Sequence, residues 1–256
     1  ILNQVADKIC FTKIITGEEG ERLLGIYGSA VKVAMIMAML TQAFRYAYEP
    51  MVFSTAAKDK AGQNKVYADA MKYFIIFSLL AFLFVMFYLD FLKFIIGRTY
   101  WEGLKVVPIV MMAEIFMGIY FNLSFWYKLI DQTWWGAIFS FIGCAVLLAI
   151  NFIYVPQYGY MACAWGGFAG YATCMLLSYF IGQKKSPINY PLKEIAVYVL
   201  LAAVLYVIYL YVDRKELSDW LTLIINTGLI CIYLAYLIKK DLPLSSLPVI
   251  GKYFRK

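Results

Sequence analysis

Long apolar runs separated by short polar segments constrain the fold of this sequence more than any other feature. A hydrocarbon core about 30 Å thick is crossed by about 20 apolar residues in an α-helix. Runs of this length recur along the 256 residues at Leu24–Phe53, Tyr73–Ile96, Leu104–Leu129, Thr133–Val155, Gly159–Gly182, Leu192–Val212 and Leu217–Ile238. The sequence therefore predicts an all-α polytopic membrane protein with these seven complete spans.

The composition agrees with this fold class and argues against an enzyme. The chain is 63% hydrophobic and 15% charged, whereas a soluble domain carries about 25% charged residues. It has no histidine, which excludes most zinc sites and Ser-His or Cys-His nucleophiles. Its five cysteines lie in apolar stretches, so we expect them to be small buried side chains. We expect no cofactor, no metal and no catalytic residue.

The distribution of lysine and arginine predicts the orientation. Because successive spans alternate sides, the connections fall into two sets. One set has 13 positive residues and the other has 5, which are Arg22, Arg98, Lys105, Arg214 and Lys215. Cytoplasmic loops carry the excess of positive charge, so the basic set and the C-terminus are predicted to be cytoplasmic. The net charge of +7 then indicates contact with membrane lipids rather than with nucleic acid.

Aromatic and small residues add two further expectations. Tyrosine and tryptophan gather at predicted span ends, as in the aromatic belt at the membrane interface; they are Tyr100, Trp101, Trp126, Tyr127, Trp134, Trp135, Tyr158, Tyr160 and Trp220. In the span Gly159–Gly182, the small residues Ala162, Gly166 and Gly170 are four apart. Gly136 and Ser140 repeat this spacing in the preceding span. Such spacing favours close packing of two helices.

Ionisable residues inside the spans are the candidate functional residues. Glu114 lies near the centre of its span, and Lys32 about two turns inside its own. Arg45 and Glu49 are four residues apart, so that they can pair on one helix face. A charge inside a span normally faces a bundle interior or a wet cavity. For Lys32, Arg45 and Glu49, reaching the nearby headgroups is the alternative.

Two stretches resemble a known family. Leu24-Gly25-Ile26-Tyr27-Gly28-Ser29-Ala30 and Gln42-Ala43-Phe44-Arg45-Tyr46-Ala47-Tyr48-Glu49-Pro50 are similar to the second half of bacterial oligosaccharide flippases. These flippases belong to the multidrug/oligosaccharidyl-lipid/polysaccharide (MOP) exporter superfamily. Ala6-Asp7-Lys8 resembles the helix that opens the second lobe of these proteins.

The resemblance implies a fold of two six-span lobes around a central cavity, with two further C-terminal helices. Residues 1–182 would then be a partial second lobe, namely the end of one span and five complete spans. Residues 183–238 would be the two additional spans, and residues 239–256 a basic cytoplasmic tail. We expect the chain to begin partway through a longer protein, whose N-terminal lobe would be its partner in the bacterial inner membrane.

The resemblance also implies a function. Such flippases carry undecaprenyl-pyrophosphate-linked oligosaccharide across the inner membrane for O-antigen, capsule or exopolysaccharide synthesis, and cations in their cavity meet the pyrophosphate. Arg45 lies in the matching stretch, so it takes this role by resemblance. Lys32 is assigned to the same role from its depth. We expect Glu49 and Glu114 to tune the charge or couple the transport cycle.

Other functions remain open. A drug/cation antiporter or a lipid II flippase of the same superfamily would have the same span pattern. A membrane-embedded polysaccharide polymerase or acyltransferase is an alternative of another class, although the predicted outer loops are short for catalysis. A membrane scaffold without transport is a third alternative, and charges inside the spans argue against it.

Overall fold

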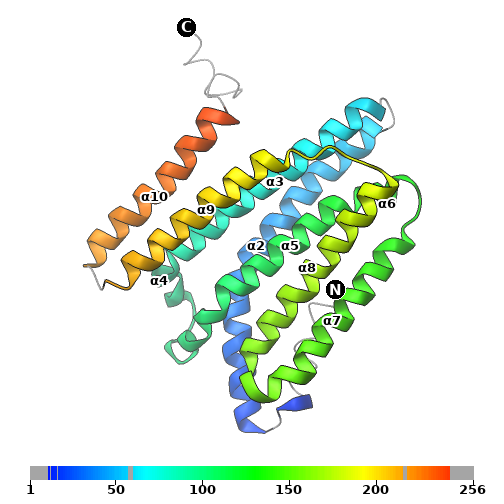
Figure 1. Cartoon of the computed structure of the whole chain (residues 1–256). Helices are drawn as coiled ribbons and strands as arrows, with labels where there is room; N and C mark the ends of the chain where they lie inside the picture. The colour runs from blue at the N-terminus through cyan, green and yellow to red at the C-terminus, as the bar shows by residue number, and fades with distance from the viewer. Residues whose placement is uncertain (1–10, 12, 16, 57–59, 216–217, 243–256) are drawn as a thin grey trace.

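The computed structural model describes residues 11, 13–15, 17–56, 60–215 and 218–242, and within these residues the chain forms helices and no strand. The long helices are α2 (Glu18–Ala56), α3 (Lys60–Phe87), α5 (Val107–Leu123), α7 (Trp134–Tyr158), α8 (Tyr160–Lys185), α9 (Leu192–Asp213) and α10 (Asp219–Lys240). Short helical segments connect them: α4 (Leu89–Leu92), η1 (Lys93–Ile95), η2 (Arg98–Val106) and α6 (Phe125–Leu129). The long helices lie side by side in a slab (Figure 1).

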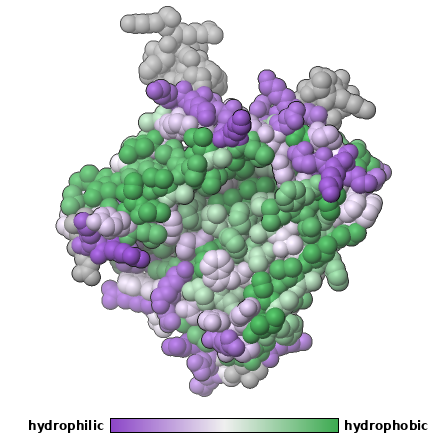
Figure 2. Space-filling view, in the orientation of Figure 1, coloured by the Kyte–Doolittle hydropathy of each residue, from purple (hydrophilic) through white to green (hydrophobic). Residues whose placement is uncertain are grey.

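Among the described residues, six helical segments are long and apolar enough to cross a membrane: Glu18–Val52, Asn64–Phe87, Arg98–Leu129, Trp134–Tyr158, Leu192–Asp213 and Trp220–Lys240. Figure 2 shows hydrophobic residues across the middle of one face and hydrophilic residues gathered toward its upper and lower edges. The chain is an all-α polytopic membrane protein, as predicted.

The predicted span Gly159–Gly182 is a helix, α8, but it is not among those six segments. Its glycines lower its hydropathy, and they also place it against α7. A Cβ atom on Gly170 would lie 2.8 Å from the backbone oxygen of Gly143, and one on Gly166 would lie 2.5 Å from Asn151 Oδ1. Both neighbours belong to α7, so α8 packs closely along it, as the spacing of small residues predicts. Gly136 instead faces the ring of Tyr127.

The second predicted span, Tyr73–Ile96, is wrong at both ends. Helix α3 begins at Lys60 and ends at Phe87, and the chain then forms the short turns of α4, η1 and η2. The apolar run continues past the helix, so hydropathy alone misplaces its end. Beyond it, Trp101 Nε1 donates hydrogen bonds to the backbone oxygens of Lys93 and Ile96. At its beginning, Lys72 is buried within α3 instead of lying in a loop.

The helix ends form two groups on opposite sides of the bundle. We call the group that carries the basic set of lysines the basic end, and the other group the opposite end. At the basic end, the buried side chains Val52, Tyr67, Phe125 and Ile188 form one cluster that joins α2, α3, α6 and the segment before α9. At the opposite end, Tyr160 of α8 donates a hydrogen bond of 3.2 Å to Glu102 of η2. The basic end is the one predicted to be cytoplasmic.

Helices α9 and α10 pack on α3, away from α7 and α8 (Figure 1). Asn226 Nδ2 of α10 donates a 2.8 Å hydrogen bond to the backbone oxygen of Phe87, and Tyr233 donates one of 2.9 Å to that of Ile76. Both bonds give a buried polar side chain of α10 a partner that hydrocarbon could not supply. Helix α10 is therefore anchored to α3 at two levels along its length.

Two expectations about side chains are corrected. Trp126 and Tyr127 are buried rather than interfacial, because α6 turns inward and Trp126 Nε1 donates a 3.3 Å hydrogen bond to Ser178 Oγ. Cys231 is exposed on α10, whereas Cys144, Cys163 and Cys174 are buried as expected. Ile1–Cys10, which includes Ala6-Asp7-Lys8, and residues 243–256 of the predicted tail lie outside the described residues.

The contact between α7 and α8 yields a test. Gly170→Ala places a methyl group against the backbone of Gly143, which cannot move aside as a side chain would, so we expect a loss of about 1–3 kcal/mol in stability. Thermal unfolding in detergent micelles, followed by circular dichroism, measures the loss. Gly167→Ala is the matched control, because nothing lies within 4 Å of its added Cβ. Equal unfolding temperatures for the two variants would contradict the packing.

Candidate functional site

A cluster of three charges joins α2 to α6 near the basic end. Glu49 Oε2 lies 3.7 Å from Arg45 Nε one helical turn earlier. The other oxygen of Glu49 accepts a 2.9 Å hydrogen bond from Lys128 Nζ of α6. The three side chains are about 30% exposed. Since two cations share one carboxylate, the cluster keeps one positive charge.

Arg45 retains capacity to bind an anion. Its guanidinium lies 5.2 Å from the ring centre of Phe121 and 5.5 Å from that of Tyr46, at the distance of cation–π contacts. Its buried Nε has no hydrogen-bond partner among the described residues. A guanidinium carries five N–H donors in a planar fork that suits phosphate oxygens. The rings of Phe121 and Tyr46 and a loose contact with Glu49 therefore hold Arg45, and its guanidinium keeps N–H donors that an anion can use.

Polar atoms continue from Arg45 into the contact between α2 and α5. Thr41, Arg45 and Asn122 line a small cavity of about 10 Å³, close to the volume that one water molecule needs. Thr41 Oγ1 and Gln42 Oε1 are buried without a hydrogen-bond partner among the described residues. In a span, unpaired polar atoms are costly, so this row marks a polar seam in an otherwise apolar contact.

Glu114 lies on the same side of α5 as the seam but does not join the cluster. It precedes Gly118 by one turn and Phe121 by two, and both of these line the small cavity. Its side chain is half-buried, and it forms no ion pair or hydrogen bond with another described residue. The structure thus places Glu114 on the helix face that lines the small cavity, without contact to either predicted cation.

Lys32 is separated from Arg45. Their separation of 13 positions on α2 corresponds to about 20 Å along the helix. Lys32 is exposed and lines a different cavity, which the turns after α3 help to form. The structure brings together Arg45 and Glu49 among the predicted site residues, adds Lys128 to them, and leaves Lys32 and Glu114 apart.

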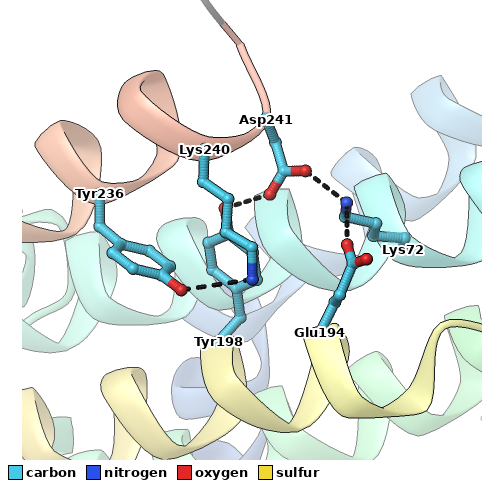
Figure 3. Close-up of polar contacts among 6 residues, drawn as sticks. All are labelled: Lys72, Glu194, Tyr198, Tyr236, Lys240 and Asp241. Atoms are coloured by element: carbon cyan, nitrogen blue, oxygen red, sulfur yellow. Dashed lines mark hydrogen bonds and ion pairs between the residues drawn. The ribbon is translucent and has the colours of Figure 1, made fainter.

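A second charged cluster, which sequence reasoning missed, lies where α3, α9 and α10 meet. Lys72 Nζ donates hydrogen bonds to Glu194 of α9 and to Asp241 at the end of α10 (Figure 3). Tyr198 donates to the other oxygen of Asp241. The orientation was predicted from lysine and arginine alone, so the carboxylates of this cluster were not considered. The signal was present in two acids, Glu194 and Asp241, at span ends on the same predicted side as Lys72.

Asp241 depends on these partners for its charge. Burial alone would raise the pKa of Asp241, but the hydrogen bonds from Lys72 and Tyr198 outweigh burial and hold its pKa below the ordinary 3.8. A carboxylate with a depressed pKa contributes stability above its ordinary pKa and loses that contribution as the pH falls through the folded value. The cluster therefore holds α10 through the physiological pH range.

Asp241→Asn tests this attachment. The amide cannot neutralise Lys72, so we expect faster hydrogen exchange in α10 and a loss of about 1–3 kcal/mol at neutral pH. The difference from the unchanged protein should stay constant from neutral pH to about pH 5, shrink as the pH approaches 3.8, and be lost once the pH has fallen through the depressed pKa of the folded state. Glu19→Gln, at an exposed position of the opposite end, is the control. A difference that grew toward low pH would contradict the assignment.

Within the described residues, no group of three cysteine, aspartate or glutamate side chains is placed to hold a metal ion. Comparisons of the chain with protein-family models, with curated proteins and with solved structures find no match.

Proposed function

We propose that this chain forms part of a flippase that moves polyprenyl-pyrophosphate-linked oligosaccharide across the bacterial inner membrane. The observation that carries the proposal is the state of Arg45. It is a partly exposed guanidinium in a span, held against two rings, whose contact with Glu49 is loose at 3.7 Å. Such a guanidinium offers a positive charge and N–H donors, which are the groups that bind a pyrophosphate.

The charges suggest how the cargo would enter. A diphosphate and a sugar chain cannot cross hydrocarbon unaided, because stripping charged groups of water costs too much free energy. At the basic end, phosphate oxygens would replace Glu49 as the partner of Arg45. Glu49 would keep Lys128, at 2.9 Å, so that no carboxylate is left unpaired. Glu49 thereby tunes the strength of the anion site.

Transport needs a cavity that opens to one side at a time, as when one bundle rocks against another. We propose that the partly exposed Arg45, at the edge of the polar seam, faces that path, and that an N-terminal lobe completes it. Lys32 would meet the cargo near the opposite end of α2. The C-terminus would lie in the cytoplasm, because the basic end carries most of the lysines.

Glu114 favours a second candidate, a cation-coupled antiporter of the same superfamily. A half-buried carboxylate without an ion-pair partner among the described residues can take up a proton or a cationic drug during a cycle. In the flippase proposal the same residue would couple cargo movement to an ion. The two functions differ in whether Arg45 or Glu114 is needed for cargo binding.

Arg45→Gln in the full-length protein tests the proposal. Loss of one charge-assisted contact of about 1.5–3 kcal/mol predicts a fall of about 10- to 100-fold in export. Surface polysaccharide in cells that depend on this transporter is the measurement, with the protein level checked by immunoblot. Arg45→Lys should retain part of the activity, since it keeps the charge and loses the fork.

Lys65→Gln provides the matched control, because Lys65 is exposed on α3 and lies outside the proposed path. Normal export by Arg45→Gln at normal protein level would refute the flippase proposal. Efflux of a cationic drug that Glu114→Gln abolishes, together with normal polysaccharide export by Arg45→Gln, would favour the antiporter.

A further inference from the structure

The cavity that contains Lys32 is a separate feature at the opposite end of the molecule. Its volume is about 340 Å³, within the size range of ligand sites. Ser29, Lys32, Val33 and Ile36 of α2 form one wall. The other wall comes from the turns after α3, at Leu92, Ile96, Gly97 and Tyr100. It shares no lining residue with the small cavity beside Arg45.

Lys32 gives this cavity an available positive charge. The side chain is exposed and lines the cavity, and no carboxylate among the described residues pairs with it. The nearby carboxylate of Asp90 is taken by Lys93, at 2.6 Å. Lys93 and Arg98 both lie over the ring of Trp101, at 5.0 and 5.9 Å. Among the residues that line the cavity, Lys32 is therefore the charged side chain, and its ammonium group has no carboxylate partner within the described part of the chain.

The depth of the cavity matches the membrane interface. Helix α3 ends at Phe87, and the following backbone runs in short turns, which are not exposed to lipid inside the hydrocarbon core. Tyr100 and Trp101 lie in these turns, and such amphipathic rings are typical of the headgroup level. A ligand of this cavity would meet Lys32 where the headgroups of one leaflet lie.

Exposed apolar side chains flank the cavity on both walls. Met35, Ile36 and Met39 are exposed on α2, at 48%, 41% and 67%, and Phe91 and Phe94 are exposed on the facing turns. A free anion would make no use of these surfaces. A lipid would place its chains along them while its headgroup meets Lys32.

We propose that this cavity binds the anionic phosphate headgroup of a lipid that stands in the leaflet at the opposite end. The phosphate pairs with Lys32, and the chains lie along the flanking apolar side chains. Binding itself does not depend on transport. The further step, that a cargo lipid occupies this cavity after crossing, rests on the proposed function.

Photocrosslinking tests the site directly. A benzophenone amino acid replaces Ile36, which lines the cavity and is partly exposed, in the whole protein reconstituted into nanodiscs. The discs contain phosphatidylcholine alone, or phosphatidylcholine with phosphatidylglycerol or with polyprenyl pyrophosphate. Mass spectrometry identifies the lipid that is crosslinked. We expect crosslinks to the anionic lipids, and Lys32→Gln should reduce them about tenfold, the loss of one charge contact.

The controls separate this site from general attraction and from transport. Lys65→Gln removes an exposed charge elsewhere and should leave the crosslinks unchanged. Equal loss in both variants, or crosslinks that survive Lys32→Gln, would overturn the proposal. Soluble pyrophosphate that competes as well as the lipid would show a site for free anions and would overturn the lipid assignment.

The two anionic discs distinguish the sources of the phosphate. Preferential crosslinking of polyprenyl pyrophosphate supports occupation by the cargo, and equal crosslinking of phosphatidylglycerol supports a membrane lipid. Because the assay needs no transport, it can succeed while Arg45→Gln leaves export normal, so that failure of the flippase proposal is recognised separately.

Discussion

Pairing of charges where the chain meets hydrocarbon is the constraint on which the rest of this structure depends. Hydrocarbon offers no hydrogen bonds, so a charged side chain in a span needs another charge, water or a headgroup. Lys72 shows the consequence most clearly, since it is buried in α3 with Glu194 and Asp241 as partners. This pairing allows α3 to begin well before its apolar run and holds α9 and α10 against it.

The same constraint separates the remaining charged side chains into those that are paired within the bundle and those that are available to a ligand. Glu49 shares its carboxylate between Arg45 and Lys128, and the cluster keeps a positive charge. Lys32 and Glu114 have no ion pair within the described part of the chain. A structural ion pair neutralises itself, whereas a charge without a partner remains available to a ligand. The charges that we connect with function are therefore the net positive charge of the cluster around Arg45 and the unpaired Lys32 and Glu114.

Much of the fold could be predicted because hydropathy and helix length are local properties. The helices α2, α7, α9 and α10 begin and end within several residues of the predicted spans, and the packing of Gly166 and Gly170 against α7 follows from their spacing. The end of α3 could not be predicted in this way, because the segment Leu89–Ile96 is apolar except for Asp90 and Lys93, and yet it is not part of the long helix. The partners of Lys72 come from helices more than 100 residues away.

The candidate site was predictable only in part for a similar reason. The pair of Arg45 and Glu49 follows from their separation of four residues, but Lys128 reaches Glu49 from α6, 79 residues further along the chain. Arg45 by resemblance and Lys32 by its depth in the span were both expected to meet the pyrophosphate. The position of the turns after α3 shows instead that Lys32 has its own cavity.

Spin labels at defined positions test most directly whether lipid surrounds these helices while the paired charges stay out of it. In a cysteine-free protein reconstituted in bilayers, labels would be placed at Leu200 of α9 and Ile232 of α10, both exposed, and at Glu49. We predict that dissolved oxygen relaxes the first two more strongly than a water-soluble nickel chelate does, and that the order reverses at Glu49. Chelate access at Leu200 and Ile232 equal to that at Glu49 would contradict the membrane-embedded bundle.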